Sequence, residues 1–133
     1  MRASDVVVIS LPLTRTTRGL IGKKELAWMK PDAILVNVAR GAILDEEALY
    51  GHLKSHPNFM VGIDAWWIEP FIHGTFRMDY PFLDLPNVLG SPHNSAIVAN
   101  VLLSAVRQAA ENTKRFLKGE QVRGIARRED YLG

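Results

Sequence analysis

The chain has 133 residues, the length of one ordinary domain, and its content of 47% hydrophobic and 23% charged residues is that of a globular protein with a buried core. Its formal net charge of +2 at pH 7 is small, and the basic residues near the C-terminus are interpreted as a solvated helix end, so no nucleic-acid partner is expected. The lack of cysteine excludes disulfides and thiolate metal sites, and without a secretory signal or a membrane-length apolar run we expect a cytoplasmic protein.

Short apolar runs alternate with helical segments along the chain. Strands are predicted at residues 5–10, 33–38, 59–63 and 87–90, and the first is expected to be buried on both faces. Helices are predicted at residues 22–29, 45–55 and 95–118, with Asp45 as the N-cap of the second and Gly119 as the residue that ends the third. Residues 66–85, rich in proline and aromatic residues, are expected to be irregular. This alternation indicates an α/β fold with a parallel sheet and right-handed crossovers.

The last predicted helix is unusually apolar. A surface helix needs an apolar stripe only about 100° wide. The stripe here is wider, which predicts contacts on two sides, one with the sheet and one with a second subunit or a missing domain. Its apolar residues include Val98, Val101, Leu102, Ala105, Val106, Ala109, Phe116 and Leu117.

Polar residues follow the predicted strands at the end where open parallel sheets bind ligands. Arg40 follows the second strand, Asp64 and Glu69 follow the third, and His93 follows the fourth. An arginine, a glutamate and a histidine at one edge could bind a carboxylate and transfer a proton.

Each of these residues also has a simpler interpretation. Arg40 could be a surface residue, Asp64 and Glu69 could be turn residues, and His93 could be a neighbour of a helix cap. The other histidines match no motif and are interpreted as surface or helix-end residues; they are His52, His56 and His73. No group of His, Asp and Glu has the spacing of metal ligands, so no metal is predicted.

Several motifs occur in a fixed order between residues 4 and 118. They are Leu-Pro-Leu-Thr at 11–14 with Thr-Arg-Gly-Leu-Ile at 17–21, Leu-Val-Asn-Val-Ala-Arg-Gly at 35–41 leading into 44–49, Gly-Ile-Asp-Ala at 62–65 before Glu-Pro at 69–70, and Ser-Pro-His at 91–93. Together they closely resemble the D-isomer specific 2-hydroxyacid dehydrogenase family. Its members, such as glycerate, phosphoglycerate and formate dehydrogenases, are two-domain oxidoreductases that interconvert 2-hydroxy and 2-keto acids with NAD or NADP.

The resemblance implies a catalytic role for three residues. Arg40 would hold the carboxylate and carbonyl oxygen of the substrate, because its planar fork suits paired oxygens. His93 would protonate the carbonyl oxygen as hydride arrives, and would act as the base in reverse. Glu69 would pair with His93, fix its tautomer and favour the imidazolium.

The resemblance also implies a set of cofactor-binding residues. Asp64 would accept a hydrogen bond from the nicotinamide carboxamide, while the others line the cofactor trench after the strands. These others are Leu11, Pro12, Thr17, Val38, Ala39, Asn94 and Ser95. The family often has a run of small residues after the histidine, and the Asn-Ser-Ala here departs from that pattern. The hydride chemistry belongs to the cofactor.

Two further departures concern the pocket and the dinucleotide fingerprint. Many members have an Asp-Val-Phe stretch between the third strand and the glutamate, and here the segment is Asp-Ala-Trp-Trp-Ile at 64–68. Trp66 and Trp67 could shape a bulkier substrate pocket or pack against the catalytic loop, and packing is the favoured interpretation. The Gly-x-Gly-x-x-Gly fingerprint occurs nowhere in the chain. We therefore expect residues 1–133 to be a truncated C-terminal portion, with the nicotinamide half of the NAD-binding domain at about 4–94, a closing helix at about 95–118 and a tail.

This organisation predicts an exposed edge strand around residues 6–9. Such an edge is a liability unless it is paired or covered, so we expect the chain to form a homo-oligomer or to complement a separate N-terminal half. Two functions stay open. The chain is part of a dehydrogenase acting on a small 2-hydroxy or 2-keto acid, or it is a non-catalytic dehydrogenase-like module for oligomerisation or partner binding.

Overall fold

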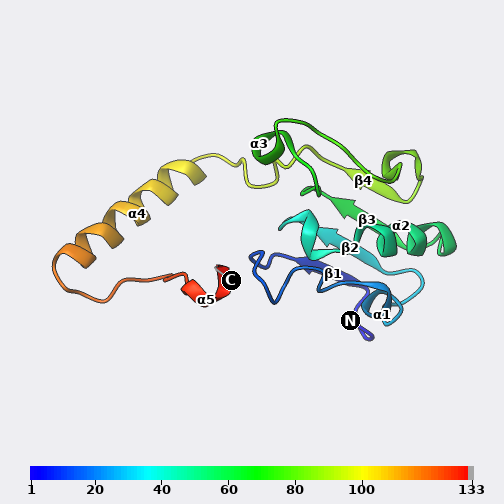
Figure 1. The fold of residues 1–133 in the computed structure, drawn as a ribbon, viewed down its shortest axis with the longest axis horizontal. Coiled ribbons are helices and arrows are strands. Elements are labelled where there is room, and N and C mark those ends of the chain that lie inside the picture. Colours follow the sequence, from blue (N-terminus) through cyan, green and yellow to red (C-terminus); the bar gives the residue numbers. More distant parts are fainter. Residues whose placement is uncertain (132–133) are drawn as a thin grey trace. The chain divides into compact units, whose positions relative to one another are not determined.

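The computed structural model describes residues 1–131, which divide into a first compact unit, Met1–Asn94, and a second that begins at Ser95. The first unit contains a four-stranded parallel sheet in the order β1-β2-β3-β4 (Figure 1). The strands are β1 (Val6–Ile9), β2 (Ile34–Asn37), β3 (Met60–Ile63) and β4 (Val88–Gly90). The predicted α/β fold with a parallel sheet is therefore confirmed.

Helices connect the strands of the first unit, and two of them begin close to the predicted positions. They are α1 (Lys23–Leu26), α2 (Glu46–Ser55) and α3 (Pro70–His73), and 3₁₀ turns occur at Gly41–Ile43 and Phe82–Asp84. Asp45 is the N-cap of α2 as predicted, because its Oδ1 accepts a hydrogen bond of 2.7 Å from the N–H of Ala48. Helix α1 ends earlier than predicted, since Trp28 and Met29 donate to carbonyls only three residues before them.

The two faces of the sheet differ in burial. Side chains of Leu35 and Ile63 join the core on the face that α1 and α2 cover through Leu26, Leu49 and their neighbours. Two right-handed crossovers that run in the same direction place both helices on this one face.

The opposite face of the sheet is exposed. Val8 is 58% exposed and Leu89 is 76% exposed, and they lie on the row that joins Val8, Val36, Gly62 and Leu89 across the sheet. Met60, two residues before Gly62 and therefore on the same face of the sheet, is exposed as well. The prediction that the first strand is buried on both faces is thus wrong for this chain. The predicted exposed edge strand is present as β1.

The second unit contains α4 (Val101–Leu117) and α5 (Arg128–Tyr131). Helix α4 begins later than predicted, because Asn100 has a left-handed backbone with φ of 64° that interrupts the helical path. Its end agrees with the prediction: Gly119 has φ of 71°, its N–H donates to the carbonyl of Phe116, and Glu120 N–H donates to that of Arg115.

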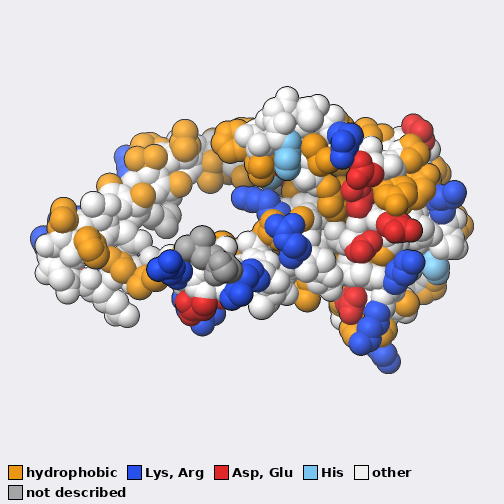
Figure 2. Space-filling model, viewed as in Figure 1, with side chains coloured by type: hydrophobic (Ala, Val, Ile, Leu, Met, Phe, Trp, Pro, Cys, Tyr) orange, Lys and Arg blue, Asp and Glu red, His pale blue; other side chains and the backbone are white. Residues whose placement is uncertain are grey.

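None of the residues of α4 is buried, and hydrophobic side chains are visible along it (Figure 2). The wide apolar stripe predicted one contact with the sheet and one with a second subunit or a missing domain, and both contacts stay predictions. Within residues 1–131, the helices are all too short or too polar to cross a membrane.

Candidate active site

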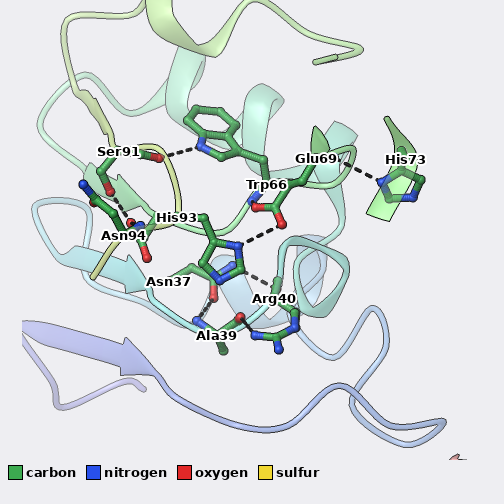
Figure 3. A network of polar contacts seen from close by, with 10 residues as sticks. Asn37, Ala39, Arg40, Trp66, Glu69, His73, Ser91, His93 and Asn94 are labelled. Carbon is green, nitrogen blue, oxygen red and sulfur yellow. Dashed lines mark hydrogen bonds and ion pairs between the residues drawn. The ribbon is translucent and has the colours of Figure 1, made fainter. Parts of the chain in front are cut away.

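The turn after β2 is held by a buried asparagine. Asn37 is completely buried; its Oδ1 accepts from Ala39 N–H at 3.1 Å and its Nδ2 donates to the carbonyl of Arg40 at 3.0 Å. These bonds satisfy backbone groups that leave the sheet, so the direction of the turn is fixed. The guanidinium of Arg40 donates to the carbonyl of Ala39 at 2.7 Å and remains exposed (Figure 3).

Gly41 brings this turn against the loop that follows β3. A Cβ on Gly41 would lie only 2.4 Å from the carbonyl carbon of Trp66, so the two backbones are in direct contact. A residue with a side chain cannot occupy this position without moving one loop. The close approach sets Arg40 beside the segment that carries Glu69.

Glu69 is buried and both of its carboxylate oxygens accept hydrogen bonds. Oε1 accepts from the backbone N–H of Trp66 at 2.7 Å, and Oε2 accepts from Nδ1–H of His93 at 2.8 Å (Figure 3). The backbone N–H of Glu69 in turn donates to Nδ1 of His73 at 3.1 Å. An ionised carboxylate can only accept a hydrogen bond, so the form of His93 that pairs with it carries a proton on Nδ1.

His93 has a strained backbone that its neighbours stabilise. Its φ of 53° lies in the left-handed region, which costs a non-glycine residue about 1–3 kcal/mol. Ser91 Oγ and Asn94 N–H, on either side of it, donate to Oδ1 of the buried Asp64 at 2.5 and 3.0 Å. Asp64 therefore anchors both ends of the turn that presents His93. The hydrogen bond at Nδ1 leaves Nε2 as the nitrogen that can face a substrate.

The two tryptophans have different surroundings. The Nε1–H of Trp66 donates to the carbonyl of Ser91 at 2.8 Å, and its ring meets Phe76 edge to face with centroids 5.5 Å apart. The Nε1–H of Trp67 donates to the carbonyl of Leu44 at 2.8 Å, and its ring stacks on Phe82 at 5.3 Å. Each of the two hypotheses for the pair thus fits one residue: Trp66 borders the cavity described next, and Trp67 packs.

A cavity of about 910 Å³ opens between these loops. Arg40, Glu69 and His93 all line it, together with Ser91. The rest of the wall is mainly apolar and consists of Trp66, Pro70, Phe71, Ile72, Phe76, Leu83, Gly90 and Pro92. The structure therefore brings together the three residues with an expected catalytic role, although this closeness alone does not test that role.

The residues expected to bind the cofactor lie in the loops after the strands. The hydroxyl of Thr17 donates to the carbonyl of Pro12 at 2.7 Å and accepts from Thr14 N–H at 2.8 Å, so it holds the loop after β1. Leu11 is exposed at the start of this loop. After β2, Val38 is half-buried and Ala39 is buried. Asn94 ends the first unit and Ser95 begins the second. Their cofactor contacts stay predictions.

Two residues that stabilise the site had no individual role in the sequence analysis. They are Asn37 and Gly41. An asparagine at the end of an apolar strand and a glycine directly after Arg40 were visible signals. The sequence gives no signal for the position of Trp66 between two loops, because that position depends on a contact with Ser91, far along the chain.

His52 lies in the last turn of α2, which agrees with its interpretation as a surface or helix-end residue, but its ring is half-buried. Its Nε2 is buried without a hydrogen-bond partner, and its ring stacks on His56 at 4.0 Å and meets Phe59 edge to face. Burial lowers the pKa of His52 below its ordinary value of 6.5, and the nearby His56 lowers it further. Within residues 1–131 no three His, Asp or Glu side chains gather closely enough to hold a metal ion.

A parallel sheet with its polar site at the carboxyl ends of the strands defines the class of α/β proteins that bind a ligand there. Comparison with known proteins agrees with this class. Residues 1–95 match the family described as D-isomer specific 2-hydroxyacid dehydrogenase, NAD binding domain. This chain therefore belongs to the D-isomer specific 2-hydroxyacid dehydrogenase family, as its motifs predicted.

Individual relatives cover most of this chain. D-3-phosphoglycerate dehydrogenase of Methanocaldococcus jannaschii is 36% identical over 93% of the chain, and glyoxylate/hydroxypyruvate reductase B of Pectobacterium carotovorum is 40% identical over 88%. The chain spans only 22% of the first relative and 35% of the second.

Solved structures show the same fold. A D-isomer specific 2-hydroxyacid dehydrogenase of Xanthobacter autotrophicus, in complex with NADPH and MES, has a TM-score of 0.79 and 34% identity over 95% of this chain and 49% of its own. D-lactate dehydrogenase of Lactobacillus jensenii, with NAD+, has a TM-score of 0.72 and 28% identity over 96% of this chain and 41% of its own. The prediction of NAD or NADP as the cofactor is confirmed for this domain by the matched family and these neighbours.

Proposed function

We propose that this chain provides the substrate-binding and proton-transferring edge of an NAD(P)-dependent dehydrogenase that interconverts 2-hydroxy and 2-oxo acids. The observation that carries the proposal is the 2.8 Å hydrogen bond between Glu69 and His93, which lies in the wall of the same cavity as Arg40. A carboxylate–imidazole pair beside a guanidinium can bind an anionic 2-oxo acid and supply a proton to it.

Arg40 binds the substrate. Its planar fork of N–H groups matches the carboxylate and the neighbouring carbonyl oxygen of a 2-oxo acid. The bond from Arg40 to the carbonyl of Ala39 uses one terminal nitrogen, so N–H donors remain for the ligand. These hydrogen bonds also polarise the carbonyl group toward addition at its carbon.

His93 moves the proton. In reduction, Nε2–H of His93 protonates the carbonyl oxygen while a hydride adds to the carbonyl carbon; in oxidation, Nε2 removes the proton from the hydroxyl group. Glu69 accepts from Nδ1–H, so the ring keeps its orientation and the charge of the imidazolium is balanced. A bound nicotinamide supplies the hydride in one direction and accepts it in the other.

The loops after the strands fit the nicotinamide end of the cofactor. Small and apolar side chains follow β1 and β2, so that backbone and apolar surface can meet a flat ring, with Leu11, Pro12, Val38 and Ala39 as the candidates. Asp64 is a buried carboxylate at the same edge that already accepts two protein donors. We assign to Asp64 a role in orienting the carboxamide. We also assign contacts with the cofactor to Asn94 and Ser95, which follow His93. Thr17 holds the first of these loops.

The exposed face of the sheet favours a second candidate function. Val8, Met60 and Leu89 form an apolar surface on the first unit, and Leu102 and Phe116 are exposed on α4. Apolar surface of this kind marks interaction sites. The chain would then be a non-catalytic module that forms a homo-oligomer or complements a separate N-terminal half.

Cofactor binding and turnover separate the two functions. The purified chain is titrated with NADH by fluorescence and then assayed with glyoxylate, hydroxypyruvate and related 2-oxo acids. We expect NADH binding, and turnover that falls by about a hundredfold or more in Arg40→Met. The control Arg107→Met changes an exposed arginine that does not line the cavity and should leave turnover unchanged. Absence of NADH binding at millimolar concentration, or equal turnover in both variants, contradicts the enzymatic proposal and favours the second candidate.

A further inference from the structure

The cavity beside His93 has a polar end and a large apolar wall. Trp66 and Phe76 form one side in edge-to-face contact, and Leu83 lies against Gly90, where a Cβ would be 2.7 Å from Leu83 Cδ2. Phe71 and Ile72 extend the wall and are 99% and 66% exposed. In the face shown in Figure 2, hydrophobic side chains lie beside a histidine near the position of α3.

Resting on the proposed function, we propose that the substrate is a 2-oxo acid, or the matching 2-hydroxy acid, with a bulky uncharged side chain, aromatic or branched aliphatic. The carboxylate and carbonyl groups lie at Arg40 and His93, and the side chain lies on the wall formed by Trp66, Phe71 and Phe76. The size of the cavity and its distribution of charge carry this inference.

The size favours a bulky side chain. The cavity, at about 910 Å³, is near the upper end of the range of small-molecule pockets, which is about 300–1,000 Å³. Glyoxylate or pyruvate would occupy only its polar end and would leave the apolar wall in water. A benzyl or isobutyl group would cover Phe76 and Ile72 and remove their apolar surface from solvent, which is favourable.

The distribution of charge disfavours a second anionic group. Among the described residues that line the cavity, Arg40 is the only lysine or arginine, and Glu69 adds a negative charge beside it. A phosphate or second carboxylate on the substrate would therefore lie against aromatic rings without a counter-charge. Burial of an unpaired charge is costly, so phosphorylated and dicarboxylic 2-oxo acids are poor ligands of this wall.

Binding to the full chain tests the substrate class without turnover. The chain labelled with ¹⁵N is titrated with phenylpyruvate, pyruvate and 2-oxoglutarate, and the indole N–H signal of Trp66 reports occupancy of the cavity. We expect phenylpyruvate to bind at least about tenfold more tightly than pyruvate, because it buries apolar surface on the wall. 2-Oxoglutarate should bind no more tightly than pyruvate.

Two variants examine the wall itself. Phe76→Ala should weaken phenylpyruvate binding by about two- to tenfold, the range of an aromatic contact, and leave pyruvate binding unchanged. Phe71→Ala should act in the same direction, and this fully exposed side chain can be removed without loss of the fold. The control Phe116→Ala removes an exposed phenylalanine of α4 that does not line the cavity and should have no effect.

The outcomes distinguish this inference from the proposed function. Equal affinity for phenylpyruvate and pyruvate, tighter binding of 2-oxoglutarate, or no effect of Phe76→Ala overturns the substrate class while Arg40-dependent binding of 2-oxo acids upholds the function. Binding of phenylpyruvate that persists fully in Arg40→Met indicates apolar adsorption and overturns the substrate class. Failure of every 2-oxo acid to bind overturns both.

Discussion

The indole N–H of Trp66 donates a hydrogen bond of 2.8 Å to the carbonyl oxygen of Ser91 and so joins the loop after β3 to the loop after β4. The backbone N–H of the same tryptophan holds Oε1 of Glu69. Trp66 thus contacts both loops whose side chains meet in the Glu69–His93 pair. The geometry of that pair depends on a residue that is expected to take no part in proton transfer.

Trp66→Phe should loosen this connection. The substitution keeps an aromatic ring but leaves the carbonyl of Ser91 without its donor, which costs about 2 kcal/mol of unfolding free energy. We expect a lower midpoint in urea and a weaker hydrogen bond between Glu69 and His93, seen as exchange broadening of the Nδ1–H proton of His93 by NMR.

Trp67→Phe is the matched control for this variant. It also removes an indole donor, to the carbonyl of Leu44, and should lower the urea midpoint by a similar amount. Trp67 does not line the cavity, so the Nδ1–H signal of His93 should be unchanged. Equal broadening in both variants would show that Trp66 has no special place in the site.

Gly41→Ala should be destabilising, because the new Cβ would lie 2.4 Å from the backbone of Trp66 and one of the two loops must shift to make room. Overpacking of this kind costs about 1–3 kcal/mol, measured by denaturant unfolding. Gly51→Ala in α2 is the control: nothing lies within 4 Å of its added Cβ, and alanine should stabilise the helix by about 0.5–1 kcal/mol. If Gly41→Ala proves neutral, the close approach of the two loops is incorrect.

Glu69→Gln should change the tautomer of His93. The carboxamide oxygen can accept from Trp66 N–H, which places the NH₂ group opposite Nδ1 of His93. Nδ1 must then accept, so the proton moves to Nε2, and long-range ¹H–¹⁵N NMR should show the change. Glu47→Gln, an exposed change in α2, should leave the ring as it is. Persistence of the Nδ1–H form in Glu69→Gln would contradict the proposed pairing.

Acidification should destabilise the fold through His52. Its pKa in the folded chain lies below the ordinary value of 6.5, so the unfolded chain binds the proton more readily. The unfolding free energy should therefore be unaffected well above pH 6.5 and should fall as the pH decreases from 6.5 through the lowered folded-state pKa. His52→Leu removes the titrating ring and should flatten this part of the pH profile, measured by urea unfolding between pH 5 and 8. An identical slope in both proteins would assign the effect to other groups.

The exposed sheet face should promote self-association. Val8 lies on the edge strand β1 in the row that reaches Leu89, so a lysine at this position places a charge on the apolar surface. We expect the chain to associate at micromolar concentration in analytical ultracentrifugation and Val8→Lys to weaken association by about tenfold, since the charge must be desolvated. Asn58→Lys adds the same charge at an exposed turn and should have little effect. A monodisperse monomer at these concentrations would count against the exposed face as an interface.

Much of the fold and of the candidate site follows from local patterns. The apolar runs locate every strand, Asp45 and Gly119 mark helix ends through their own backbone chemistry, and the residues after the strands include Arg40, Glu69 and His93. These features are predictable because they depend on neighbours in the chain. The start of α4 was misplaced, since the left-handed turn at Asn100 has no strong local signal.

By itself, then, the sequence determined the α/β class, the family and the residues that meet at the carboxyl edge of the sheet, because strand periodicity and the order of motifs are written along the chain. The tertiary structure decided which face of the sheet is covered, that Trp66 rather than Trp67 borders the cavity, and that Asp64 anchors the turn of His93. These properties arise from contacts between distant segments, such as Gly41 against Trp66 and Glu69 against His93. Loop packing sets those distances, and no pattern of neighbouring residues encodes them.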